Sequence, residues 1–156
     1  MSQLNQILER LATIQETITI GSAPGETVGK AYPYMPANPP ASECPFTVNE
    51  IGGGPADLSA VSGLQAVTDR ITMHLCLSPW ELDVSTEATM EEICNWRDAV
   101  FSTFAGKVRL GNDLAYILTA IITAWDIEKI QLGTTWFGAL KFTLTVKELY
   151  TQTIAA

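Results

Sequence analysis

The clearest pattern in the chain is an alternation of apolar and polar residues near its end. In the run Leu140-Lys141-Phe142-Thr143-Leu144-Thr145-Val146-Lys147, every second residue from Leu140 is apolar, and the residues between are Lys or Thr. This period of two predicts a strand with one face in a core and one polar face, and its β-branched residues favour that structure. The polar face has no His, Cys or carboxylate, so we expect scaffold or interface there.

Three other segments also predict strands. Residues 66–77 alternate in the same way, and Pro79 ends that strand because proline cannot donate to a central ladder. Residues 46–49 form a short candidate. Residues 114–130 are an extended apolar run, and the final strand is expected over residues 135–148.

Two segments predict helices. Residues 2–17 have apolar residues at helical spacing (Leu4, Ile7, Leu8, Leu11 and Ile14), and a second helix is expected from Thr86 or Thr89 to Phe104. The resulting order is helix, short strand, long strand, helix and two long strands. It predicts one α+β domain over residues 1–156, with a mostly antiparallel β-sheet and two helices packed on one face.

Two loops are expected to extend from this domain. Residues 21–43 are rich in proline, and residues 50–64 are rich in glycine. Long loops in compact domains are usually functional or ordered by a partner. The expected partner-contact residues are Tyr32, Tyr34, Met35, Gly52, Gly53 and Gly54.

The composition is apolar for a small monomer, with 47% hydrophobic and 17% charged residues. Buried contacts between subunits would explain this, although one large core or long neutral loops would also do so. The net charge is −8, and the nine Lys and Arg residues are scattered, which argues against direct nucleic-acid binding. The acidity either keeps DNA from sticking in a passage or simply aids solubility.

No cofactor, metal or membrane partner is expected. The three cysteines have no metal-ligand spacing and indicate a reducing compartment, and the N-terminus has no signal-peptide pattern. The longest apolar stretch, residues 114–125, is too short to span a bilayer. These features predict a soluble protein that is made in the cytoplasm.

Little in the chain predicts catalysis. His74 is the only histidine and is expected to be a satisfied histidine within a sheet, so we do not expect an enzyme. The Gly52-Gly53-Gly54-Pro55 segment has no following Lys-Ser or Lys-Thr and does not predict a phosphate cradle. Glu87, Glu91 and Asp98 fall nearly in line on the second helix, as a negative stripe facing a lumen or as an ordinary solvated face.

The layout resembles that of the tail terminator proteins of long-tailed bacteriophages, and more loosely other small neck proteins. The resemblance covers roughly residues 1–20 and 66–150. It rests on the leading helix, the connection Ala31-Tyr32-Pro33-Tyr34, the helix with Trp96-Arg97-Asp98-Ala99-Val100-Phe101 and the closing strand with Phe142-Thr143-Leu144-Thr145-Val146.

This resemblance implies a structural virion protein of the tail and neck, made in the host cytoplasm. It would form a ring of identical subunits, typically a hexamer, that caps the tail tube and stops its polymerisation. Its partners would be the tail tube protein and a head-completion protein, and DNA would pass through without specific binding. The two loops would make the contacts with head and tube.

Two alternatives to a tail terminator remain at this stage. One is a head-completion (stopper or adaptor) protein of the connector. The other is a small binding module that uses the Pro-rich loop and the aromatic residues, which include Trp80, Trp96, Trp125 and Trp136.

Overall fold

The computed structural model describes residues 2–58, 64–80, 87–111 and 113–151. Its elements in chain order are α1 (Gln3–Gln15), β1 (Lys30–Tyr32), a short 3-10 helix (Ala41–Glu43), β2 (Phe46–Gly52), β3 (Ala56–Leu58), β4 (Leu64–Pro79), α2 (Glu87–Ala105), β5 (Ile117–Leu132) and β6 (Thr135–Thr151).

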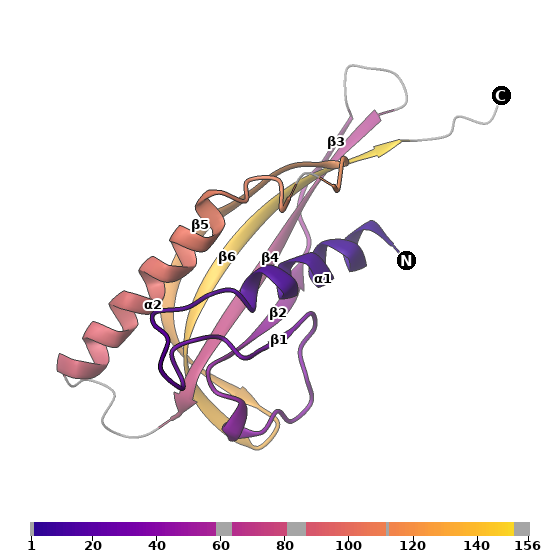
Figure 1. The fold of residues 1–156 in the computed structure, drawn as a ribbon. Helices are drawn as coiled ribbons and strands as arrows, with labels where there is room; N and C mark the ends of the chain where they lie inside the picture. The colour runs from indigo at the N-terminus through magenta and orange to yellow at the C-terminus, as the bar shows by residue number, and fades with distance from the viewer. Residues whose placement is uncertain (1, 59–63, 81–86, 112, 152–156) are drawn as a thin grey trace.

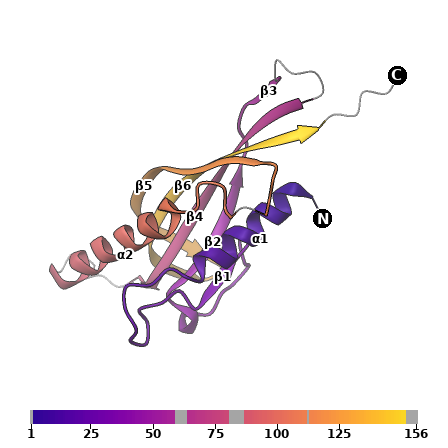
Figure 2. The ribbon, with the colours of Figure 1, turned by 45° about the horizontal axis from the view of Figure 1, so that its top comes forward.

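The strands form one sheet in the order β1-β2-β4-β6-β5, and β3 lies beside β4. The β1–β2 pair is parallel, and the other pairs are antiparallel. Both helices lie on the same side of this sheet (Figure 1), and the rotated view agrees (Figure 2). The predicted α+β fold, with a mostly antiparallel sheet and two helices on one face, is confirmed.

The main core lies between the helices and the two central strands. The register sets Ile71, Met73 and Leu75 of β4 opposite Leu144, Phe142 and Leu140 of β6, and all six side chains are buried. The helices complete the core with Ile7, Leu8, Leu11 and Ile14 from α1 and Ile93, Trp96, Val100 and Phe104 from α2. The alternation seen in the sequence therefore becomes the helix-covered face of the sheet.

A smaller core lies on the opposite face, where the long β5–β6 hairpin curls back toward β1 and β2 (Figure 1). It contains Phe46, Val48, Cys76, Leu132, Phe137 and Ala139. The rings of Phe46 and Phe137 meet edge to face, with centroids 5.2 Å apart. At the hairpin turn, Gly133 has a φ of +66°, and an added Cβ would come within 2.8 Å of the Ala37 carbonyl oxygen. The hairpin tip thus touches the Pro-rich segment.

Buried polar contacts fix the C-terminal end of α1 on β2. The Gln15 side chain donates to Asn49 Oδ1 at 2.7 Å and accepts from Thr47 Oγ1 at 2.8 Å. Asn49 Nδ2 also donates to the backbone oxygen of Tyr32 at 3.1 Å. These three buried polar side chains satisfy one another, which avoids the cost of unpaired polar groups.

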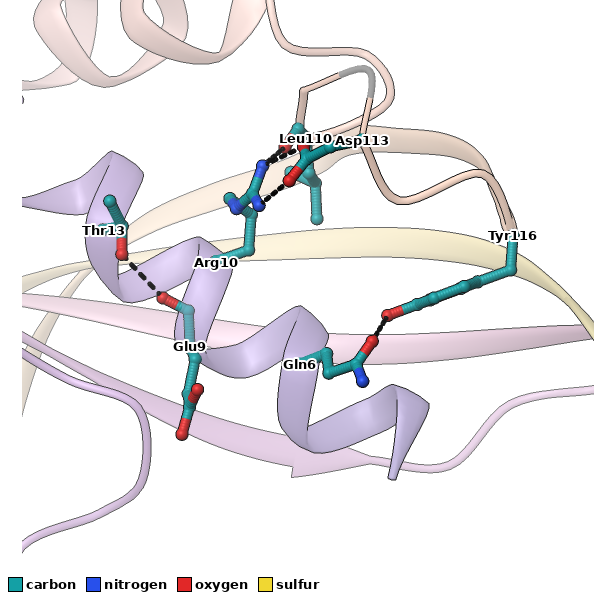
Figure 3. A network of polar contacts seen from close by, with 7 residues as sticks. All are labelled: Gln6, Glu9, Arg10, Thr13, Leu110, Asp113 and Tyr116. Carbon is teal, nitrogen blue, oxygen red and sulfur yellow. Dashed lines mark hydrogen bonds and ion pairs between the residues drawn. The ribbon is translucent and has the colours of Figure 1, made fainter. Parts of the chain in front are cut away.

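A second set of contacts ties α1 to the segment that leads into β5 (Figure 3). The Arg10 guanidinium donates to the Leu110 carbonyl at 3.1 Å and forms a two-pronged ion pair with Asp113. This bond to Arg10 lowers the pKa of Asp113 to about 2. One turn earlier, the Tyr116 hydroxyl donates to Gln6 Oε1 at 2.6 Å. Helix α1 therefore helps to place the start of β5.

The two expected loops contain more regular structure than predicted. The Pro-rich segment includes β1, which pairs with β2, and the short 3-10 helix. In the Gly-rich segment, β2 continues to Gly52 and β3 follows at Ala56–Leu58, so both strands run along the same edge of β4. Sequence reasoning missed β1, β3 and the extension of β2 beyond residue 49, because each of these depends on pairing with a partner strand rather than on its own pattern.

Two acidic side chains lie together on the helix-covered face, near the start of α1. Glu148 of β6 is 1% exposed, and its carboxyl accepts from Gln3 Nε2 at 3.3 Å. Burial, followed by a hydrogen bond and charge repulsion from Asp69 of β4, raises the pKa of Glu148 to about 7. One carboxyl oxygen of Asp69 is buried without a hydrogen-bond partner. The pair therefore favours holding one proton.

This pair predicts a pH dependence of stability. The pKa of Glu148 is about 7 in the folded chain and 4.5 as its ordinary value, so the folded state binds the extra proton between these pH values. The free energy of unfolding should therefore fall as pH rises through this range. Glu148→Gln removes the ionisation, and we expect the variant to gain about 1–2 kcal/mol relative to the native chain between pH 5 and pH 8. Urea unfolding of both proteins at a series of pH values measures the difference in their free energies of unfolding. A difference that is the same at pH 5 and at pH 8 would contradict the prediction.

Candidate interaction surface

Strand β5 leaves one long edge of the sheet open. It is the last strand in the sheet order, and within the described residues its strand partner is β6 alone. The start of its outer edge is covered, because Ala120 N donates to the Val108 carbonyl at 2.6 Å and Arg109 Nε donates to the Ile117 carbonyl. Farther along, Ile127 N is satisfied by the side chain of Asp126 at 2.8 Å. An edge of this length is a template for pairing with another chain.

The same edge is apolar. Ile121, Trp125 and Ile127 of β5 are 51%, 40% and 44% exposed. We call these three exposed residues of β5 the apolar edge; the register sets Trp125 and Ile127 opposite Phe142 and Leu140 and Ile121 opposite Thr145, so apolar side chains extend from both faces of this strand. A groove between the end of α2 and β5 runs into it, and its lining includes Phe101, Val108 and Ile121. Exposed apolar side chains along an open edge strand indicate an interaction site.

Cationic side chains lie against the exposed tryptophans. The Arg97 guanidinium is 5.2 Å from the ring centroid of Trp125. Lys129 Nζ is 4.9 Å from the centroid of Trp80 and 4.8 Å from that of Trp136. These cation–π contacts hold the rings in place, so the apolar edge has preformed aromatic contacts to offer a partner.

The predicted acidic stripe lies on α2. Glu91 and Asp98 are exposed, and α2 begins at Glu87, whose side chain lies outside the described residues. Arg97 donates to the Asp98 carboxylate at 2.7 Å, so part of the stripe is neutralised by its neighbour. Whether these acids face a lumen stays a prediction.

The predicted contact residues of the Pro-rich segment differ in exposure. The Tyr32 hydroxyl bonds to Glu43, its ring packs edge to face on Phe46, and burial followed by that bond raises the pKa of Tyr32 to about 12. Tyr32 is therefore an anchor for the segment. Tyr34 is exposed and donates to Asn5 Oδ1 at 2.7 Å, and Met35 is also exposed. These last two residues are available to a partner.

Histidine 74 is a buried sheet residue with two acidic partners. Its two ring nitrogens contact the carboxylates of Glu50 on β2 and Glu128 on β5. Among the described residues, no group of three or more His, Cys, Asp and Glu side chains is arranged to hold a metal ion. Sequence reasoning found the histidine but missed both partners, since strand order alone brings these three positions together.

Comparisons with known proteins add no relative: no protein-family model matches the sequence, and no curated protein matches it either. Within the part of the chain that the structure describes, no helix is both long and apolar enough to cross a membrane. The apolar edge of β5 is therefore the feature on which a functional proposal depends.

Sequence reasoning also missed the apolar edge. It predicted an extended apolar run over residues 114–130 and did not say which of its residues would be exposed. A strand buried on both faces and a strand at an open edge have the same kind of sequence when a partner covers the edge. The low fraction of charged residues was the one signal that such a partner exists.

The Gly-rich segment gives a sharp test of its packing. An added Cβ at Gly54 would lie 2.0 Å from the Thr68 carbonyl oxygen, whereas one at Gly53 would meet nothing within 4 Å. We expect Gly54→Ala to lower the free energy of unfolding by about 2 kcal/mol or more, because backbone has to separate from β4. The matched variant Gly53→Ala should change it by less than about 0.5 kcal/mol. Chemical denaturation of both variants compares them, and equal effects would show that this contact is not tight in solution.

Proposed function

We propose that this chain is a structural virion protein, a tail terminator whose subunits form a ring at the end of a phage tail tube. The ring would stop tube polymerisation and join the tube to the head-side connector. Its partners would be further copies of itself, the tail tube protein and a head-completion protein.

The single observation that carries this proposal is the apolar edge. A strand with an open backbone edge and exposed Ile121, Trp125 and Ile127 is an aggregation hazard in a monomer. Proteins usually shorten, charge or cover such an edge; this strand is sixteen residues long, is covered at its start by Val108, and exposes Asp126 and Lys129 beside its apolar residues. Regular self-association covers the edge without requiring a second gene product, and this supports an oligomer.

A ring also needs two different surfaces on each subunit. Head-to-tail contacts close into rings when the rotation between subunits closes, whereas a self-complementary patch gives a dimer. Among the described residues, exposed apolar side chains also occur at the other edge of the sheet, with Ile51 on β2 and with Tyr34 and Met35 after β1. An open edge at one side and a separate apolar patch at the other favour head-to-tail assembly.

The charge distribution is compatible with a passage for DNA. The net charge of −8 and the scattered cations leave no basic stripe in the sequence to hold phosphates. Half-buried Arg97 and exposed Lys129 lie against tryptophan rings. The layout resemblance to tail terminators supplies the specific role, and the same surfaces would also suit a head-completion protein of the connector.

The proposal is tested by the assembly state and by tube growth. Purified protein should form closed rings by electron microscopy and mass measurement, and it should limit tube length when added to polymerising tail tube protein. Rings found on tube ends support a terminator, whereas rings found on filled capsids support the head-completion alternative. A stable monomer that leaves tube growth unchanged would contradict the proposal, and ligand binding by that monomer would favour a binding module.

A matched pair of variants connects the ring to the apolar edge. Ile121→Lys places a charge on the open edge, and we expect it to weaken association at least about tenfold because an unpaired buried charge is costly. Its unfolding free energy should change by less than about 0.5 kcal/mol, since the side chain is exposed in the single chain. Thr13→Lys introduces the same charge at an exposed position of α1 and should leave assembly intact. Rings that persist in Ile121→Lys would place the interface elsewhere.

A further inference from the structure

Three strands meet at His74 on the polar face of the sheet. His74 of β4 is 4% exposed, and its Nε2 atom is 3.0 Å from Oε2 of Glu50 on the neighbouring strand β2. Its Nδ1 atom contacts Oε1 of Glu128 on β5, which lies beyond β6. The side chains of Glu128 and Glu50 are 19% and 58% exposed.

The residue between these strands explains how the contact forms. Neighbouring strands lie about 4.8 Å apart, so the backbones of β4 and β5 are separated by roughly twice that distance. Ala139 of β6 pairs with Cys76 on one side and Glu128 on the other, and its small side chain leaves room above it. Glu128 can therefore reach across β6 to His74, and the curled hairpin is tied to the centre of the sheet.

The two contacts identify the protonation state of the ring. An ionised carboxylate only accepts hydrogen bonds, and a neutral imidazole donates from one nitrogen only. Both ring nitrogens of His74 face carboxyl groups, so when both carboxyls are ionised both nitrogens donate and the ring is an imidazolium. The bonds to Glu128 and Glu50 raise the pKa of His74 above its ordinary value, against the opposing effect of burial, which is the largest single influence.

Other charged groups around the ring are few. Lys141 of β6 lies opposite His74 in the register, and Asp126 of β5 lies opposite Lys141. On β4 itself, the residues that share this face with His74 are Thr72 and Cys76 next to it and the cation Arg70 beyond Thr72. Lys141 and Asp126 carry opposite charges, and Glu50 and Glu128 are the acids in direct contact with the ring.

We propose that His74, Glu50 and Glu128 form a proton-dependent latch that ties β2 and β5 to β4, and that loss of the His74 proton releases Glu50. A neutral ring can still donate to one carboxylate. Glu128 is the more enclosed of the two and would lose more without a donor, whereas water can solvate the more exposed Glu50. The latch does not depend on the proposed ring function.

The direction of the pH effect follows from linkage. A histidine whose pKa is raised on folding stabilises the fold fully below its ordinary value of 6.5, and this contribution disappears as pH rises through the folded value. Ionisation of Glu148 also lowers the free energy of unfolding as pH rises, and it does so over an overlapping range of pH. Measurements of stability therefore need the Glu148→Gln background, whereas a signal from the ring itself isolates the latch.

The chain has one histidine, so proton NMR reports the His74 pKa without assignment. We expect a value above 6.5 in the native chain. Glu128→Gln should lower it by about 1 pH unit or more, and Glu50→Gln by less because that carboxylate is largely solvated. Glu9→Gln removes an exposed carboxylate from α1 and should leave it unchanged. A native value at or below 6.5, or equal values in the Glu128→Gln and Glu9→Gln variants, would overturn the latch.

Release of Glu50 has its own measurement. In the Glu148→Gln background, amide hydrogen exchange corrected for intrinsic rates should show less protection of residues 46–52 at pH 8 than at pH 6, with residues 140–146 as the internal reference. Adding Glu50→Gln should remove this difference, because a glutamine side chain can bond to either form of the ring. This exposed position also allows the variant to fold if Glu128→Gln does not. Protection that is independent of pH in the parent would overturn the release of Glu50.

Discussion

The antiparallel pairing of β4 with β6 is the constraint on which the rest of the structure depends. Side chains alternate between the two faces along each strand, so the register that sets Met73 opposite Phe142 also sets His74 opposite Lys141. A slip by one residue would turn the apolar set toward the polar face and leave both helices without a core. The two faces are therefore specified together, and each helix only has to present one apolar stripe to the same surface.

The length of the β5–β6 hairpin determines what the sheet offers to other molecules. Its tip curls back to make the second core with Phe46 and Phe137 and to touch the segment at Ala37. Among the described residues, its outer strand has no backbone neighbour beyond the short cover at Val108, so the apolar edge stays open. The same hairpin therefore covers the second core with its tip and leaves the outer edge of β5 open.

The buried ionisable groups of the two faces are arranged in opposite ways. On the helix-covered face, Glu148 and Asp69 are two carboxyls that repel, and one of them retains a proton. On the polar face, His74 lies between two carboxylates; burial opposes its protonation, but the bonds to Glu128 and Glu50 raise its pKa. Both sites bind protons more tightly in the folded chain, since low local solvation strengthens attraction and repulsion alike. The ion pair of Arg10 and Asp113 helps to place the segment before β5 but adds little to the free energy of unfolding, because solvent screens it.

The sequence alone determined the long helices and strands, because each is specified by the pattern of apolar residues within its own segment. Periods of two and of 3.6 located β4, β6 and both helices, and Pro79 marked the end of β4. Short strands β1 and β3 were not predictable, since three residues have no period of their own and depend on a partner strand. The same limit applies to the sites. His74 could be located in a strand, but Glu50 and Glu128 become its partners only through strand order and curvature. Strand β5 becomes an open edge because it is the last strand of the sheet that the described residues form. Tertiary structure decided these features because each is a relation between residues that are far apart in the chain.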